Sequence, residues 1–279
     1  SYMDLVIKTT DHTEPLGIDK NMPARFLLPL IDQKAASGFV NASLALDQAR
    51  AVKDIQEQEL MRKASHLNDM AMAEITHFFK EGVTETDLAE QLKKIYRDLG
   101  ADGLSFEPLF AFGSNAASGH HWPDDTRLKP GDCILVDIGC TWEGYCSDMT
   151  RTFFYKNVTQ HQQEVYHTVL KANEEAEKAV TPGIPLSSLD QIARGIITDK
   201  GYGSAFTHRL GHFIGLEDHE FGDVSSASAD RAVPGNIFSI EPGIYLENDM
   251  GVRVEDLVLV TDHGHEILNH FSKELTVID

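Results

Sequence analysis

The stretch PGDCILVDIG at residues 130–139 has a counterpart in PGNIFSIEPG at residues 234–243. In both copies a Pro-Gly turn leads into an apolar run that ends at an acidic residue. Upstream of each copy lies a second pair of matching segments, 82–100 and 183–201. The two pairs of segments occur in the same order, and the members of each pair are separated by nearly the same number of residues. Together these matches predict an internal repeat. We therefore expect two similar αβ halves, at about residues 53–158 and 160–279.

Hydrophobic periodicity predicts the elements of these halves. Apolar residues recur at three- and four-residue steps from Ala42 to Phe79, which predicts a helix. A second helix is expected to start at Thr84, where Asp87 stands three residues on as in a capping box, and to end at Gly100. The other expected segments are helices at 160–180 and 186–200, strands within 106–154 and 205–279, and loops with one or two short elements at 1–40. This order predicts an α+β fold.

Composition and charge narrow the class of protein. The chain has 279 residues, 42% hydrophobic and 24% charged, which is ordinary for a globular protein of about two domains. A net charge of −20 argues against nucleic acid as a partner, because phosphates are repelled. No apolar run approaches the roughly 18 residues that span a membrane, and no signal peptide is visible. Three cysteines are too few for a disulfide scaffold, so we expect a reduced, cytoplasmic protein.

The repeat carries acidic residues at corresponding positions. Asp137 corresponds to Glu241, and Asp148 corresponds to Glu255. Asp137 and Glu241 each follow an apolar run, so each is expected at the end of a buried strand. An ionised carboxylate is costly to bury without a partner. Four acids on strands related by an internal repeat therefore predict convergence on a shared cation.

Histidines supply a candidate nitrogen ligand. They fall into two groups, His120 and His121 in one, and His208, His212 and His219 in the other. Glycines 211 and 215 permit close backbone approach around His212. Four carboxylates and one imidazole suit Mn²⁺, Co²⁺, Fe²⁺ or Zn²⁺ better than Ca²⁺, and they suit two ions better than one catalytic zinc. The alternative for the acids is solvent exposure, or salt bridges with Arg151 and Arg253.

Five short motifs extend these observations. They are DIG at 137–139, SDMTRT at 147–152, HRLGHFIGLEDHE at 208–220, SIEPG at 239–243 and VRVED at 252–256. Through them residues 53–279 resemble the pita-bread metallopeptidases, which comprise prolidases, aminopeptidases P and methionine aminopeptidases. The resemblance implies two pseudo-symmetric αβ halves around a curved, mostly antiparallel sheet, with helices on its outer face and metals on its concave side.

The resemblance also implies the ligands and the catalytic residues. The implied metal ligands are Asp137, Asp148, His212, Glu241 and Glu255. They imply two divalent ions, with Mn²⁺ expected first and Co²⁺, Zn²⁺ or Fe²⁺ as alternatives. Glu241 is expected to carry a proton to the leaving nitrogen. His120 and His219 are expected to hold the carbonyl oxygen of the substrate, and His121 is the alternative to His120.

The spacing of two further residues resembles the proline-specific branch of this family. His208 stands four residues before His212, and Arg253 stands two residues before Glu255. The implied function is hydrolysis of Xaa-Pro dipeptides by a homodimer, with His208 and Arg253 binding the carboxylate of the small peptide substrate. For Arg253 the alternative is a salt bridge that orients Glu255 or another acid. The alternative functions are an Xaa-Pro aminopeptidase, a metal-free creatinase-like enzyme, and a catalytically weak peptide-binding module.

The N-terminal segment contains a further resemblance. GIDKNMPARFL at residues 17–27 is similar to the end of the N-terminal domain of bacterial prolidases. We therefore assign residues 1–52 to a remnant of that domain and a linker helix, and residues 53–279 to the catalytic domain. Most of the N-terminal domain is expected to be absent, which would open the mouth of the site.

The chain departs from its relatives close to the expected ligands. Phe213 stands where relatives usually carry glycine, Asp218 replaces a small apolar residue, and residues 221–223 replace a turn that contains proline. The Phe213 side chain must either point into the pocket or pack away from it. The inward alternative, together with an open mouth, predicts weak or absent prolidase activity.

Overall fold

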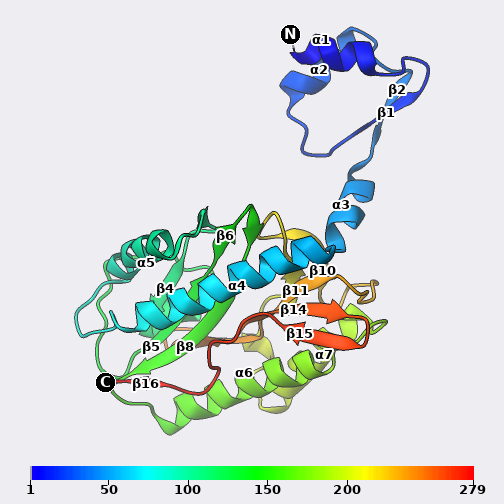
Figure 1. The fold of residues 1–279 in the computed structure, drawn as a ribbon. Helices are drawn as coiled ribbons and strands as arrows, with labels where there is room; N and C mark the ends of the chain where they lie inside the picture. The colour runs from blue at the N-terminus through cyan, green and yellow to red at the C-terminus, as the bar shows by residue number, and fades with distance from the viewer. Residues whose placement is uncertain (1) are drawn as a thin grey trace. The chain divides into compact units, whose positions relative to one another are not determined.

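The computed structural model describes residues 2–279 and contains two compact units, one ending at Arg50 and the other beginning at Ala51 (Figure 1). In the first unit β1 and β2 pair in parallel. Its elements are α1 (Tyr2–Thr9), β1 (Pro15–Ile18), α2 (Ala24–Asp32), β2 (Gly38–Asn41) and most of α3 (Ser43–Ala51). This unit is more regular than the expected loops. The sequence concealed α2 because Pro29, usually a helix breaker, lies inside the helix.

The second unit contains the remaining elements. Its helices are α4 (Ile55–Thr76), α5 (Glu85–Leu99), α6 (Gln160–Lys178) and α7 (Leu186–Asp199), with short 3-10 turns η1 (Gly113–Ala117) and η2 (Gly203–Ala205). Its strands are β3 (Gly103–Leu104), β4 (Leu109–Phe112), β5 (Cys133–Ile138), β6 (Cys140–Trp142), β7 (Tyr145–Cys146), β8 (Met149–Tyr155), β9 (Gly211–Phe213), β10 (Glu220–Val224), β11 (Ile237–Ile240), β12 (Gly243–Leu246), β13 (Met250–Arg253), β14 (Asp256–Thr261), β15 (Gly264–Ile267) and β16 (Val277–Ile278).

The single helix expected over residues 42–79 is wrong, because the chain breaks between α3 and α4. The backbone N–H of Lys53 leaves the helical pattern and donates to the carbonyl of Gly235 over 2.8 Å. The Asp54 side chain then caps α4 in a capping box with Glu57. Apolar periodicity continues across the break and conceals it, although Asp54 and Glu57 have the spacing of a capping box in the sequence.

The other helix predictions are confirmed. Thr84 and Asp87 form the expected capping box of α5, and Gly100 ends the helix in the left-handed conformation with a φ of 83°. The helices α6 and α7 lie where the periodicity placed them. A capping box at Thr159 opens α6.

The two halves of this unit build similar layers. Strands order as β16-β8-β5-β4 in one sheet and as β10-β9-β11-β14-β15 in the other, and every pairing in them is antiparallel except β16 with β8. The α4–α5 pair lies along the top of the unit and the α6–α7 pair along its bottom (Figure 1). The α4–α5 pair shares a buried apolar cluster with strands of the first half, and the α6–α7 pair shares another with strands of both halves. The prediction of an α+β fold with two αβ halves and mostly antiparallel strands is confirmed.

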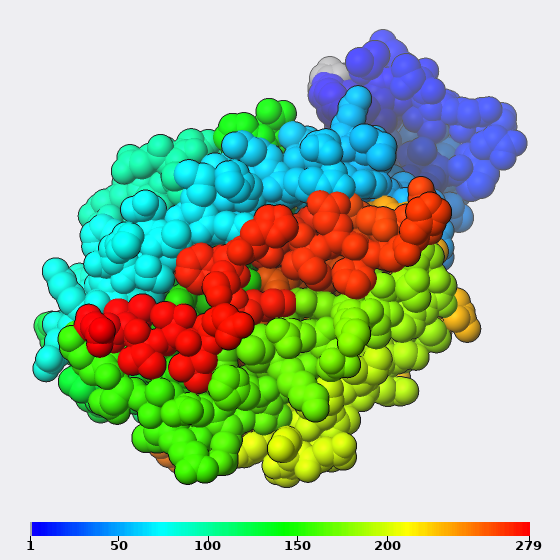
Figure 2. Space-filling model, turned by 60° about the horizontal axis from the view of Figure 1, so that its bottom comes forward, coloured from blue at the N-terminus to red at the C-terminus, as the bar shows by residue number. Residues whose placement is uncertain are grey.

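The C-terminal segment joins the halves. After β15 the chain runs along the surface between α4 and α6 (Figure 2). Asp69 of α4 accepts hydrogen bonds from the backbone of residues 270 and 271. Lys273 reaches Glu177 of α6 over 2.6 Å. The chain end therefore holds helices from both halves.

Two expectations from composition bear on the structure. The three cysteines are unpaired and buried, in agreement with reduced thiols. Among the helices of residues 2–279, none is both long and apolar enough to cross a membrane.

Candidate metal and active site

Strand pairing brings the acids of each half together. Asp137 lies near the end of β5, opposite Thr150 of β8, and Asp148 directly precedes β8. In the second half Glu241 directly follows β11, and Glu255 directly precedes its antiparallel partner β14. Because the end of one antiparallel strand lies beside the start of the next, each half places two carboxylates at one edge.

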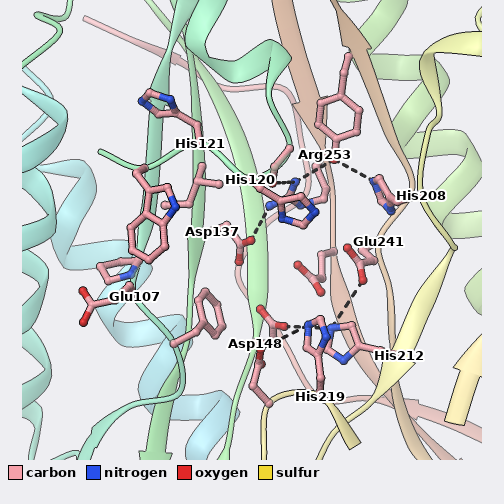
Figure 3. Close-up of a pocket in the computed structure, with 18 of the residues that line it drawn as sticks. Glu107, His120, His121, Asp137, Asp148, His208, His212, His219, Glu241 and Arg253 are labelled. Carbon is pink, nitrogen blue, oxygen red and sulfur yellow. Dashed lines mark hydrogen bonds and ion pairs between the residues drawn. The ribbon is translucent and has the colours of Figure 1, made fainter. Parts of the chain in front are cut away.

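These edges face a common pocket of about 780 Å³. Asp137, Asp148, Glu241 and His212 surround its central space (Figure 3). The site residues expected from the sequence all line it, namely His120, Asp137, Asp148, His208, His212, His219, Glu241, Arg253 and Glu255. The structure therefore gathers the whole predicted set in one place.

His212 presents a lone pair to the acids. Its Nδ1 lies 3.2 Å from the carbonyl oxygen of Phe213, which can only accept, so Nδ1 carries the proton. Burial lowers the pKa of His212 to about 3, so the ring is neutral and Nε2 has a lone pair. Nε2 lies 3.5 Å from Asp148 Oδ2 and 3.6 Å from Glu241 Oε1. Two carboxylates facing a lone pair require a positive species between them.

The carboxylates also have oxygens that only a cation or a proton would satisfy. Within residues 2–279 the buried pocket oxygens that have no hydrogen-bond partner belong to Asp137, Asp148, Asp218 and Glu255. Burial, followed by neighbouring carboxylates, raises the pKa of Asp148 and of Glu255 well above their usual range. Ligand atoms of Asp148, His212 and Glu255 all lie within 4.8 Å of one another. The residues therefore fit a divalent cation.

Glu241 is held between a hydroxyl and the imidazole. Ser239 accepts from the backbone N–H of His212 over 3.0 Å and donates its own proton to Glu241 Oε1 over 3.2 Å. Burial raises the pKa of Glu241 to about 7. This carboxyl can therefore take up and release a proton near neutral pH.

Arg253 is a buried partner of an expected metal ligand. It is 3% exposed, and its guanidinium forms a short ion pair with Asp137. Further hydrogen bonds run to Thr150 (3.0 Å), the Tyr245 hydroxyl (2.8 Å) and the carbonyl of Gly119 (3.4 Å). The geometry matches the orienting salt bridge that was the alternative role for this residue, made with Asp137 rather than with Glu255.

Tyr245 links Arg253 to His208. Nδ1 of His208 lies 2.7 Å from the carbonyl of Arg209, and Nε2 lies 2.9 Å from the Tyr245 hydroxyl. Burial, then the charge of Arg253, lowers the pKa of His208 to about 4. The neutral ring donates from Nδ1 to the carbonyl and accepts at Nε2 from the tyrosine. Both nitrogens are thus engaged within the protein.

The remaining histidines separate into two environments. The ring of His219 lies 3.8 Å from that of His212, and its Nδ1 accepts from Arg209 over 3.2 Å. His120 lies near Asp137 and Arg253, whereas the His121 ring lies away from the expected metal ligands (Figure 3). The Nε2 atom of His121 lies 2.6 Å from a carboxylate oxygen of Glu85. The structure therefore favours His120 over His121 as the residue that faces the reaction space.

Glu85, His121 and Asp124 form a second group of metal-ligand type. The Glu85 carboxylate already accepts from two backbone N–H groups, from an asparagine amide and from His121, at 2.6–3.1 Å. With its lone pairs occupied it acts as a loop anchor rather than as a metal site.

Phe213 does not narrow the pocket. It is 5% exposed, it belongs to the buried cluster of the second half, and its ring packs 5.6 Å from that of Phe238. Alternation along β9 explains this orientation, because consecutive side chains of a strand point to opposite faces and His212 faces the pocket. The expectation of a blocked pocket is therefore wrong.

Sequence reasoning missed several polar residues that support the site. Tyr245, Thr150 and Ser239 each hydrogen-bond an expected ligand or the arginine beside it. Thr150 lies within a motif that the sequence singled out, and its hydroxyl donates to Glu255 over 2.6 Å. Tyr245 had no such signal, since its role depends on partners eight and 37 residues away.

Comparisons with known proteins agree with this geometry. The prolidase from Pyrococcus horikoshii OT3 is 33% identical, with a TM-score of 0.93 over 98% of this chain and 79% of that one. The X-Pro aminopeptidase from Thermotoga maritima MSB8 is 31% identical, with a TM-score of 0.94 over 100% of this chain and 80% of that one. An uncharacterized peptidase of Staphylococcus aureus (strain MW2) is 42% identical over 244 residues, 88% of this chain and 70% of its own length.

A family model describes the greater part of the chain. It is the model of metallopeptidase family M24, and it matches residues 59–262. All five expected metal ligands lie inside the matched region. The chain therefore belongs to metallopeptidase family M24.

Proposed function

We propose that this protein hydrolyses Xaa-Pro dipeptides with two divalent cations, of which Mn²⁺ suits the donor set best. The observation that carries the proposal is the convergence of four carboxylates and the Nε2 lone pair of His212 on one space. Hard oxygen donors with a single imidazole favour Mn²⁺ among the common divalent ions. Similarity to a prolidase and to an X-Pro aminopeptidase supports the Xaa-Pro peptide bond as the bond that is cleaved.

Glu241 is the proposed carrier of the proton. When bound, the cations supply Lewis acidity and lower the pKa of water. The Glu241 carboxyl would lie beside them, where it could accept a proton from water and return it within one cycle. The nitrogen of the scissile bond belongs to the proline ring, and it leaves as a neutral amine once a proton is delivered to it. Ser239 fixes the direction from which Glu241 delivers that proton.

His219 and His120 are the proposed donors to the carbonyl oxygen. Because Arg209 donates to Nδ1 of His219, the ring proton of the neutral imidazole resides on Nε2. Burial, then the charge of Arg209, lowers the pKa of His219, which keeps the ring neutral at pH 7. An N–H aimed into the pocket can stabilise the negative oxygen that develops during hydrolysis. His120 would donate from the opposite wall.

The substrate carboxylate is proposed to bind at the end of the pocket formed by His208, Tyr245 and Arg253. Four of the five Arg253 N–H groups are engaged by the protein, which leaves one at Nη2 and the positive charge for the substrate. Arg253 would then have both of the roles considered from the sequence, because it orients Asp137 and attracts the carboxylate of the substrate.

The proposal is tested by hydrolysis of Ala-Pro, Ala-Pro-Ala and Ala-Ala by protein supplied with Mn²⁺. A dipeptidase cleaves Ala-Pro and leaves Ala-Ala intact. Cleavage of the bond before proline in Ala-Pro-Ala identifies an aminopeptidase. A tight Mn²⁺ complex that cleaves none of the three identifies a peptide-binding module. The similarity to the aminopeptidase, whose TM-score equals that of the prolidase within 0.01, makes the tripeptide arm essential.

The setting of the enzyme is part of the same proposal. We propose a cytoplasmic homodimer in which residues 53–279 form the catalytic domain and residues 1–52 a remnant of an N-terminal domain with its linker helix. The separation of contacts after Arg50 and the three unpaired cysteines support these assignments. Sedimentation of the purified protein tests the dimer, since a monomer has a mass of 31.0 kDa.

A further inference from the structure

Asp218 is a fifth carboxylate in the pocket that the expected ligand set does not include. It lies in the loop between β9 and β10, it lines the pocket, and its side chain is 21% exposed. Its Oδ1 is buried and has no hydrogen-bond partner within residues 2–279. The other pocket oxygens in this condition belong to Asp137, Asp148 and Glu255, which are all expected metal ligands.

The loop that carries Asp218 is braced rather than loose. The buried ion pair of Lys53 and Glu220, 2.8 Å long, crosses beneath it. Glu220 also accepts from the backbone N–H of Leu216 over 2.9 Å. A Cβ on Gly215 would overlap both members of the ion pair, so only glycine lets the loop lie this close. The Asp218 carboxylate is therefore held in place before any cation arrives.

The surroundings of Asp218 belong to one side of the metal site. Its Oδ2 lies 3.4 Å from Nε2 of His219, whose ring stacks on that of His212. The carboxylate therefore lies among the groups that already converge on His212 and Asp148.

The charge of the Asp218 carboxylate would balance the positive charges of the metal-loaded pocket. Two divalent cations and Arg253 bring five positive charges into the pocket, whereas the four expected carboxylate ligands bring four negative ones. Arg209 does not alter the count, because it is paired with Asp223. An unbalanced charge is costly where the groups that carry it are buried. The fifth carboxylate makes the loaded site neutral before a deprotonated water or a substrate carboxylate enters it.

We propose that Asp218 is a sixth protein ligand of the metal centre and gives its Oδ1 to the cation that Asp148 and His212 share. The inference rests on the metal centre of the proposed function and extends it by one residue. Asn at this position would keep the size and one oxygen but lose the charge. Glu217 is a matched control, since it is an exposed acid in the same loop.

The test is calorimetric titration of Mn²⁺ into metal-free protein, without substrate. Asp218→Asn should bind one of two ions about 10- to 100-fold more weakly and keep the affinity of the other, whereas Glu217→Gln should bind both as the wild type does. The retained ion shows that the variant is folded. The visible absorption of the Co²⁺-loaded protein should also change in Asp218→Asn, and Asp218→Glu should restore part of the wild-type spectrum.

Two results would overturn the inference. One is wild-type affinity for both ions and an unchanged Co²⁺ spectrum in Asp218→Asn. The other is unchanged metal binding with a raised KM for peptides, which would assign Asp218 to the substrate ammonium group instead. If the wild type itself binds no metal, the metal centre fails along with Asp218, whereas a failure of peptide hydrolysis alone leaves the metal titration valid.

Discussion

Phe213 lies next to a metal-ligand candidate but contributes to the core. Its ring packs against Phe238 and against the backbone of Gly222, where φ is 126° and an added Cβ would overlap the ring. We expect Phe213→Gly to lower the free energy of unfolding by at least about 3 kcal/mol, because it empties a buried aromatic site. Urea unfolding measures this loss.

The control for Phe213 is Phe221→Ala, since Phe221 is 49% exposed. We expect its loss of stability to be clearly smaller. Increased peptidase activity in Phe213→Gly without a loss of stability would show that the ring does obstruct the pocket. The family resemblance marks position 213 as unusual, but only strand alternation, read from β9, assigns its side chain to the core.

His208 makes stability depend on pH. Its pKa is lowered to about 4 by burial and by the positive charge of Arg253, with His120 and Arg194 as further positive neighbours, while the hydrogen bond to the backbone of Arg209 acts in the opposite direction. A histidine whose folded pKa lies below its unfolded value of about 6.5 stabilises the fold above that value and loses the contribution as the pH falls toward 4. The stability advantage of wild type over His208→Gln should therefore shrink between pH 7 and pH 5, by about 2 kcal/mol.

This comparison is made on metal-free protein, so that acid release of metal does not contribute. Thermal unfolding of both proteins at several pH values measures it. His167→Gln, a change at an exposed histidine of α6, is the control. A constant difference between wild type and His208→Gln would mean that the imidazole titrates alike in the folded and unfolded chain.

At the scale of elements, the start of α5 positions the loop that carries His120. Glu85 is fully buried and accepts four hydrogen bonds, three of them from residues 112–121 and one from Asp124. We expect Glu85→Gln to lower kcat/KM for an Xaa-Pro dipeptide about 10- to 100-fold, because His120 is no longer aimed at the carbonyl oxygen. Affinity for Mn²⁺ should stay unchanged, since no expected ligand lies in this loop.

Steady-state kinetics and Mn²⁺ titration together check the role of Glu85. Glu81→Gln, an exposed change one turn before α5, is the control. Equal losses of metal affinity and of activity would indicate general damage to the fold. Unchanged kinetics would show that the loop keeps its place without this carboxylate.

The elements that the sequence predicted are those with local signals. The capping box at Thr84 and the left-handed glycine at position 100 act within one or two turns of helix, and both are present. The break before α4 was missed because apolar periodicity continues across it, although Asp54 and Glu57 form a local capping box there. The helix with an internal proline was missed because its formation overrides local propensity.

At the scale of the whole second unit, the repeat explains why the acids could be found and their partners could not. Each of the four carboxylate ligands corresponds to a position of the other half, so one sequence pattern reveals all four, whereas His212 has no such counterpart. The buried ion pair of Arg151 with Asp256, 2.6 Å long, joins the two halves without any repeat. Such pairs lie about one hundred residues apart, and no pattern in one sequence identifies them.

The metal site should govern the stability of this unit. Without cations, four acids lie close together, and burial raises the pKa of Asp148, Glu255, Glu241 and Asp218. An acid whose folded pKa exceeds its unfolded value favours the fold at low pH, and this contribution is lost as the pH rises through the folded value, about 7 for Glu241. Metal-free protein should therefore become less stable between pH 5.5 and pH 8.

Mn²⁺ should reverse this loss, because it replaces the protons that the acids give up. At a concentration 100 times the Kd, one bound ion adds about 2.7 kcal/mol, which raises Tm by about 5–10 °C for a unit of this size. Calorimetric scans with Mn²⁺ and with a chelator should thus differ little at pH 5.5 and most at pH 8. Asp148→Asn should narrow the difference at pH 8, since it removes a charge and a ligand together. A Tm difference independent of pH would mean that the acids are ionised and satisfied without metal, which their unpaired oxygens argue against.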